Sequence, residues 1–142
     1  MSDPVVLSKK ESLERCLQQV RKYYALETGE DFRTDYLRQD AIEMNLQRIC
    51  DICIDLANMT IKRRKIGLPK DSGESFNLLH EAGVIDKDLA RSLRGMVGFR
   101  NILVHRYHEF NLDIMVDVIE NHLGDPLRFA QIIVEDFDRD SK

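Results

Sequence analysis

Hydrophobic positions recur at steps of three and four residues along nearly the whole chain, which is the spacing of one face of an α-helix. The first such segment predicts a helix from about Ser8 to about Leu26. A second, longer seam starts at Thr34 and continues until the turn residues that begin at Gly67. No segment of useful length alternates in the manner of a strand. The pattern therefore predicts a protein built from helices.

Capping residues predict two further helices in the middle of the chain. Asp71 stands three residues before Glu74, as in a capping box, and predicts a short helix over Ser72–Ala82 that the following glycine closes. Asp86 is a suitable N-cap for a fourth helix that begins at Lys87.

The last part of the chain leaves one alternative open. A fifth apolar pattern extends from Ile114 to Leu123. The next three residues, Gly124–Pro126, form either a break or a kink, because proline is tolerated in a first helical turn and the aspartate between them can cap it. Residues 126–137 are then a sixth helix or a bent continuation. We expect one all-α bundle of five or six helices over residues 1–142.

Composition narrows the function classes. The chain has 21 lysines and arginines against 25 aspartates and glutamates, a formal net charge of −4. Affinity for nucleic acid that is independent of sequence comes from massed positive charge, so this protein cannot coat nucleic acid by charge alone. Any such role must depend on a local basic patch or on a shape made by assembly.

The sequence also bears on location. Its first thirty residues mix acidic and basic side chains without the apolar run of a signal peptide, and no stretch has the roughly 20 apolar residues of a membrane helix. Three cysteines, an odd number, suit a reducing compartment better than a disulfide framework. We expect a cytoplasmic protein that does not associate with a membrane.

A charged residue interrupts the apolar stripe of the fourth helix. At about 100° per residue, Arg100 shares a face with Leu93 and Tyr107. Such a charge is costly unless an acidic side chain or an anionic ligand such as phosphate pairs with it, and the residues alone leave both open. His105 lies about 140° from Arg100 on a regular helix. The two converge only if the helix ends near Val104 or if they meet across a subunit interface.

Residues 99–107, FRNILVHRY, carry the pattern R-x4-H-x-Y, and here the chain resembles the HepT-like group of HEPN-fold toxins. The runs GVID at 83–86 and LRGMVGF at 93–99 are also similar to that group. So is the expected order of elements: two long helices, a short helix after a Gly–Pro loop, and then the helix with the motif. The resemblance covers most of the chain.

The resemblance implies a metal-independent endoribonuclease that needs no cofactor and acts as a homodimer, with the two motifs facing each other across a cleft. An RNA 2′-hydroxyl would attack its neighbouring phosphate. His105 would act as general base or acid, and Arg100 would stabilise charge on the phosphate. Asn101 would hydrogen-bond the phosphate or orient His105. The stripe that carries Arg100 would then be the dimer face.

The motif tyrosine has a separate implied role. HepT-like toxins pair with a minimal nucleotidyltransferase (MNT) antitoxin that transfers AMP from ATP to this position, here Tyr107. The attached nucleotide would bring bulk and negative charge into the cleft and so repel RNA. Taken alone, Tyr107 is also compatible with a role as an aromatic packing residue whose hydroxyl is hydrogen-bonded.

A different class of function stays open beside the nuclease. The chain could be a non-catalytic HEPN helical scaffold that binds a nucleotidyltransferase partner. The complete pair of Arg100 and His105 argues against this, because a pure scaffold has no physical need of it. The RNA target of the nuclease, tRNA or mRNA, is not given by the sequence.

The densest basic run closes the second long helix and consists of Lys62, Arg63, Arg64 and Lys65. The negative end of the helix dipole accounts for it adequately. Together with Arg33, Arg38 and Arg106 it could also form a rim that binds RNA.

No metal site is expected. Cys50 and Cys53 have the spacing of redox or zinc motifs, but they lie inside a helix with no second ligand pair, so core packing is the better interpretation. The histidines at 105, 108 and 122 lack supporting carboxylate spacing.

Overall fold

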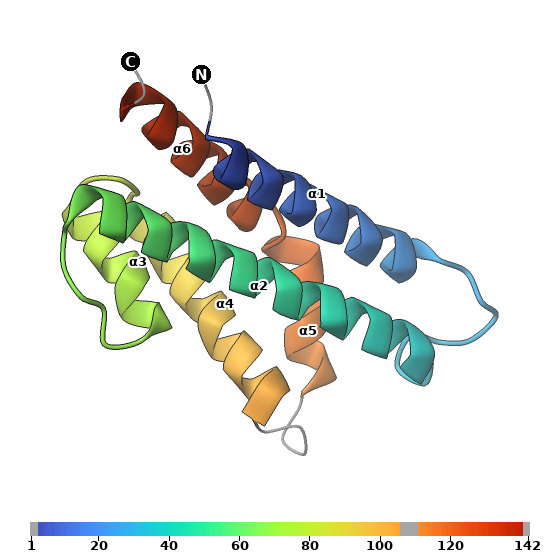
Figure 1. The fold of residues 1–142 in the computed structure, drawn as a ribbon. Helices are drawn as coiled ribbons and strands as arrows, with labels where there is room; N and C mark the ends of the chain where they lie inside the picture. Colours follow the sequence, from blue (N-terminus) through green and yellow to red (C-terminus); the bar gives the residue numbers. More distant parts are fainter. Residues whose placement is uncertain (1–2, 106–110, 141–142) are drawn as a thin grey trace.

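The computed structural model describes residues 3–105 and 111–140, and all regular structure in these two ranges is helical (Figure 1). The helices, in chain order, are α1 (Pro4–Ala25), α2 (Tyr36–Arg64), α3 (Ser72–Glu81), α4 (Lys87–His105), α5 (Leu112–Asn121) and α6 (Gly124–Asp140). The expectation of an all-α bundle is confirmed for this part of the chain. None of its helices is long and apolar enough to cross a membrane.

The two long helices α1 and α2 lie side by side and run in opposite directions (Figure 1). Helix α1 begins four residues before the predicted Ser8, because the carboxylate of Asp3 accepts hydrogen bonds from the amides of Val5 and Val6. Pro4 stands in the first turn, where its missing N–H costs nothing. This capping arrangement lies outside the apolar pattern, so periodicity alone places the start too late.

Arg38 holds the loop between α1 and α2. Its side chain is only 7% exposed, and its Nε donates to Asp35 at 2.8 Å. The remaining guanidinium nitrogens donate to the carbonyls of Tyr23, Tyr24, Leu26 and Glu30. These include carbonyls at the C-terminal end of α1, which have no partner within the helix. The idea that Arg38 helps to form an RNA-binding rim is wrong, because the fold buries its charge.

The predicted caps of α3 and α4 are confirmed. The amide of Glu74 donates to the Asp71 carboxylate at 2.8 Å, and the amide of Leu89 donates to Asp86 at 2.7 Å. Gly83, with φ of 79°, ends the α3 turn in the left-handed region that glycine adopts without strain.

The open question at Gly124–Pro126 is resolved as a break. Helix α5 ends at Asn121, and α6 starts as a separate helix at Gly124. Asp125 lies in the first turn of α6, where it accepts a hydrogen bond from Ser92 of α4 and does not act as the cap.

The core is one cluster of buried apolar side chains to which all six helices contribute. Helix α4 supplies Leu93, Met96, Val97 and Leu103 to this cluster, each at most 7% exposed. These side chains of the stripe that carries Arg100 are buried against their own chain, whereas Val104 of the same stripe is 41% exposed. That the stripe forms a dimer face stays a prediction.

An ion-pair cluster joins α2 to α6. Arg63 and Arg64 both bind the carboxylate of Asp136, which is 2% exposed, and the Arg63 guanidinium lies 4.2 Å from the ring centre of Phe137. Burial alone would raise the pKa of Asp136, but the hydrogen bonds and charges of the two arginines hold it below its usual value. Two members of the basic run thus hold helices together.

Candidate functional site

Helix α4 carries three of the residues that the sequence singles out: Arg100, Asn101 and His105. The helix ends at His105, whose side chain lies outside the described part of the structure. Arg106 and Tyr107 also lie outside the described residues.

Arg100 is paired with an aspartate of a neighbouring helix. Its Nε donates to Oδ1 of Asp51, in α2, at 3.0 Å, and its Nη1 donates more weakly to the side-chain oxygen of Asn101 at 3.4 Å. The Arg100 side chain is 27% exposed and that of Asp51 is 49% exposed. An exposed pair of this kind contributes only about 0–1 kcal/mol to stability.

This arrangement answers the question that the apolar stripe raised. An acidic side chain does meet Arg100, but the guanidinium stands at the edge of the stripe and not deep in the core. Asp51 engages the Nε side, so the other nitrogen atoms retain donors for an anion. Both interpretations therefore apply to the same residue: it is paired, and it can still bind phosphate.

Asp51 is a site residue that sequence reasoning missed. It stands 49 positions before Arg100, and no pattern in the chain marks it apart from other exposed acids of α2. Only the packing of α2 against α4 brings the two together.

Helix α4 ends at His105, one residue after Val104, the position near which the sequence requires an end if the two residues are to converge. On the regular helix the two positions are about 140° apart. The position of His105 is in register with Gly98, seven residues earlier and about 20° away. The side chain of His105 lies outside the described structure, so both ways of convergence, an early helix end and a subunit interface, stay predictions.

Two glycines, Gly95 and Gly98, lie on the exposed face of α4 that is in register with the position of His105. Gly95 and Gly98 are solvent-exposed, and a Cβ added to either would meet nothing within 4 Å. Glycine inside a helix costs roughly 1 kcal/mol relative to alanine. Nothing in the described part of the chain requires that cost, so close approach of another molecule would explain it better than packing within the monomer.

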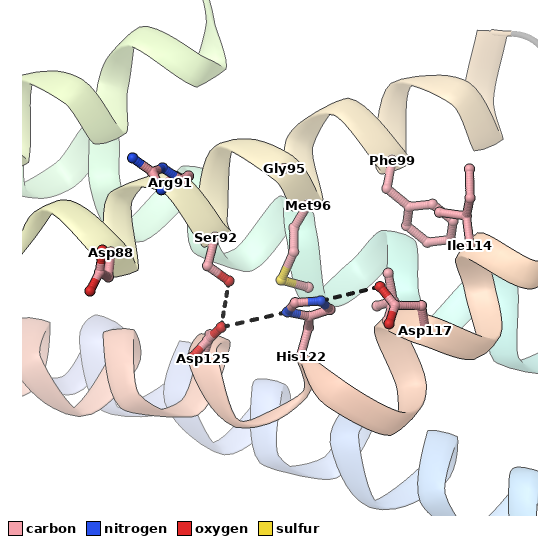
Figure 2. Close-up of a pocket in the computed structure, with 11 residues that line it drawn as sticks. Asp88, Arg91, Ser92, Gly95, Met96, Phe99, Ile114, Asp117, His122 and Asp125 are labelled. Carbon is pink, nitrogen blue, oxygen red and sulfur yellow. Dashed lines mark hydrogen bonds and ion pairs between the residues drawn. The ribbon is translucent and has the colours of Figure 1, made fainter.

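A pocket of about 460 Å³ opens beside this face, between α4 and the α5–α6 segment (Figure 2). Its floor contains Met96 and Phe99, and its rim holds a polar chain (Figure 2). In that chain Ser92 donates to Asp125, while His122 contacts Asp117 at 3.3 Å and Asp125 at 4.0 Å. These contacts connect α4, the helix that carries the motif, to α5 and α6.

The two cysteines of the C-x-x-C spacing are confirmed as core residues. Cys50 and Cys53 are each 3% exposed, and the Cys50 thiol lies 3.6 Å from the carbonyl oxygen of Met96. Burial raises the pKa of Cys50 to about 12 and that of Cys53 well above its usual value, so neither is a ready thiolate. Within residues 3–104 and 111–140 no cluster of three metal-ligating side chains occurs.

The sequence is similar to known ribonucleases over most of its length. Residues 13–133 match the family model described as ribonuclease HepT-like. The mRNA nuclease HepT of Shewanella oneidensis is 39% identical over 129 residues, which cover 91% of this chain and 96% of that protein. The tRNA nuclease HepT of Aphanizomenon flos-aquae is 26% identical over 110 residues, covering 77% and 74%.

Solved structures show the same arrangement of helices. The tri-AMPylated HEPN toxin of Shewanella oneidensis, in complex with an MNT antitoxin, superposes with a TM-score of 0.86 at 38% identity and covers 92% of this chain and 97% of that one. A toxin–antitoxin structure with AMP-PNP also gives a TM-score of 0.86, at 37% identity, covering 92% and 98%. The resemblance that the motif indicated is confirmed.

Proposed function

Because this chain belongs to the ribonuclease HepT-like family, we propose that it is the toxin of a toxin–antitoxin pair and cleaves RNA as a metal-independent endoribonuclease. The chain acts as a single HEPN domain in the cytoplasm, where its three free cysteines stay reduced. The observation that carries the proposal is Arg100: a guanidinium with unused donors, on the same helix as a histidine five residues later.

The proposed reaction uses groups of the chain itself. His105 removes the proton of a 2′-hydroxyl, whose oxygen attacks the adjacent phosphorus, and the bond to the 5′-oxygen breaks as that oxygen receives a proton. Arg100 stabilises the negative charge that develops on the phosphate oxygens. Asn101, exposed and adjacent, hydrogen-bonds the phosphate or orients His105. The products are a 2′,3′-cyclic phosphate and a 5′-hydroxyl.

The active unit in this proposal is a homodimer. The positions of Arg100 and His105 are about 140° apart on α4, and the approach of a second copy would let one substrate reach both. The exposed face with Gly95 and Gly98 supports α4 as the contact, because it permits close approach of backbones and is in register with His105. This face is the proposed dimer surface, since most of the stripe that carries Arg100 is buried.

Neutralisation involves the partner protein and Tyr107. The similar toxin of Shewanella oneidensis was solved tri-AMPylated with its MNT antitoxin. We propose that an MNT-type nucleotidyltransferase likewise transfers AMP from ATP to Tyr107 of this chain. Tyr107 is only two positions after His105, so the added phosphate would place negative charge beside the site and repel RNA.

RNA contacts outside the motif are assigned more narrowly than the sequence suggested. Arg63 and Arg64 serve the contact with Asp136, so of the basic run Lys62 and Lys65, both exposed, are the better candidates to contact RNA. Arg106, next to His105, keeps its proposed role as an RNA contact. Arg33 binds Asp113, so its charge is also partly satisfied.

Asp51 is proposed as a positioning residue that fixes the plane of the Arg100 guanidinium. Asp51→Ala is expected to lower kcat about 10-fold with little change in KM, since a misplaced catalytic group loses rate even when substrate still binds. Asp51→Asn keeps an oxygen that accepts the Nε hydrogen bond and should recover most of the rate. Steady-state cleavage of a short fluorogenic RNA measures both quantities.

Asp55 provides the matched control. It lies on α2 four residues after Asp51 and pairs with Lys9 at 3.2 Å, so Asp55→Ala removes a comparable exposed ion pair away from Arg100. It should leave kcat unchanged. Equal rates for wild type and Asp51→Ala would exclude the positioning role.

A further inference from the structure

A second groove lies on the outer surface of the α1–α2 pair, away from the α4–α5 pocket. Its volume is about 370 Å³. Three of its lining residues come from α1 and four from α2: Arg15, Gln19, Tyr23, Ala41, Met44, Asn45 and Arg48. None of them has a role in the proposed cleavage step.

Helices α1 and α2 are antiparallel, so each lining residue of α1 lies across the groove from a residue of α2 (Figure 1). The Lys9–Asp55 ion pair at 3.2 Å fixes the register of the two helices near one end. Extended along the two helices, this register places Arg15 across from Arg48, Gln19 from Asn45, and Tyr23 from Ala41, and all six residues line the groove. From Arg15 to Tyr23 the groove extends about 12 Å at the helical rise per residue.

One end of the groove is positively charged. Within the described residues, neither Arg15 nor Arg48 makes an ion pair or a side-chain hydrogen bond, and both act electrostatically on the nearby Cys16 thiol. Of the acids near them in the sequence, Glu14 pairs with Lys10 and Asp51 with Arg100, while Glu11, one turn before Arg15, makes no ion pair with it. Two guanidiniums without partners at one hollow suit a phosphodiester, which accepts hydrogen bonds from their planar forks.

The other end of the groove is aromatic and apolar. Tyr23 is half-buried, and Met44 is 50% exposed although it is apolar. Such a surface suits a nucleobase, since single-stranded nucleic acid is commonly bound by stacking of its bases on aromatic side chains beside a positive backbone track. Gln19 and Asn45 add amide groups between the two ends.

The groove ends close to the candidate active site along α2. Arg48 precedes Asp51 by three residues on α2, which is less than one turn, and Asp51 is the partner of Arg100. A strand held at Arg100 can therefore continue across the outer face of α2 to the two arginines.

We propose that the α1–α2 groove binds single-stranded RNA that extends from the cleavage site, with a phosphate between Arg15 and Arg48 and a base against Tyr23. This inference rests on the proposed function and adds to it a substrate-binding track outside the motif. It also reconciles a net charge of −4 with RNA binding, because the positive charge is local and unpaired.

The test measures binding of an unstructured fluorescent oligouridylate to the full-length chain carrying His105→Ala, so that the RNA stays intact. Adding Arg15→Gln and Arg48→Gln should weaken binding by about 10-fold and reduce the slope of log K against log salt by about 0.7, the value for one lost phosphate contact. Adding Tyr23→Ala should weaken binding by about 5-fold or more and leave the salt slope unchanged.

Arg21→Gln is the matched control, because it removes an exposed positive charge from the same helix outside the groove. It should change affinity far less than the groove variants. Circular dichroism and sedimentation confirm that each variant keeps its fold and oligomeric state.

Three results would overturn the inference. If the His105→Ala chain binds RNA and the groove variants bind it equally well, the groove is not part of the RNA track, while the proposed function stands. If the groove variants change only the oligomeric state or the affinity for the antitoxin, the occupant is a protein. If the His105→Ala chain binds no RNA at all, the proposed function fails together with the groove.

Discussion

Replacing His105 by alanine is expected to reduce RNA cleavage by about 10²–10⁴-fold, the usual contribution of a positioned general acid or base. Helix α4, which carries His105, is anchored by buried side chains on its core face. Removal of the His105 imidazole should therefore not unfold the protein. Cleavage of a defined RNA by purified wild type and variant, with the thermal unfolding midpoint recorded for each, measures both expectations.

His122 supplies a stringent control for that variant. It lies in the polar chain with Asp117 and Asp125 beside the α4 pocket, and it has no part in the proposed reaction. His122→Ala should therefore retain cleavage close to that of wild type. If His105→Ala retains activity, or if His122→Ala loses it to the same degree, the assigned role of His105 is wrong.

Incubation with the MNT-type partner, ATP and Mg²⁺ is expected to increase the intact mass of this chain by one or more AMP units. In the transfer, the tyrosine oxygen forms a bond to the α-phosphorus of ATP and pyrophosphate leaves. Tyr107→Phe lacks the accepting oxygen, so it should show no increase in mass and should stay active as a nuclease in the presence of the partner. Mass spectrometry and RNA cleavage on the same samples give both results.

The matched control for the modification is Tyr36→Phe, because Tyr36 is 70% exposed at the start of α2 and far from the motif in sequence. It should be modified as wild type is. An undiminished mass increase in Tyr107→Phe would move the acceptor to another residue and remove the proposed mode of neutralisation.

Local signals in the sequence predicted the fold where the interaction is itself local. Asp71 and Asp86 cap helices within three residues of themselves, and both appear in the structure as expected. Asp125 is the instructive exception: it has the type and position of a cap, yet it accepts its hydrogen bond from Ser92, 33 residues away. When a potential capping residue faces a neighbouring helix, its side chain can hydrogen-bond to that helix and no longer cap its own.

The site was predicted less completely, for the same reason. The motif on α4 is contiguous and could be identified, but the partner of Arg100 is Asp51, on another helix. The basic run showed the converse error, because its charge predicted a free surface while Arg63 and Arg64 bind the buried Asp136. Ion pairs across helices depend on packing and leave no periodic trace in one chain.

Helical periodicity also could not show which face of α4 packs within the chain and which face stays exposed. An apolar stripe indicates burial without saying whether the covering surface belongs to the same chain or to another copy. Here Leu93, Met96 and Val97 pack inside the monomer, and the face left open is the one with Gly95 and Gly98. The proposed intermolecular contact therefore rests on the exposed glycines and not on the apolar stripe.

The central claim is that this chain cleaves RNA with its own side chains. Its most direct test is to incubate the purified, partner-free protein with RNA in the presence of excess EDTA and to identify the ends of any fragments. Cleavage in EDTA is expected, with 2′,3′-cyclic phosphate and 5′-hydroxyl ends. Intact RNA, from a folded dimer that still binds the nucleotidyltransferase, would contradict it and identify the chain as a non-catalytic HEPN scaffold.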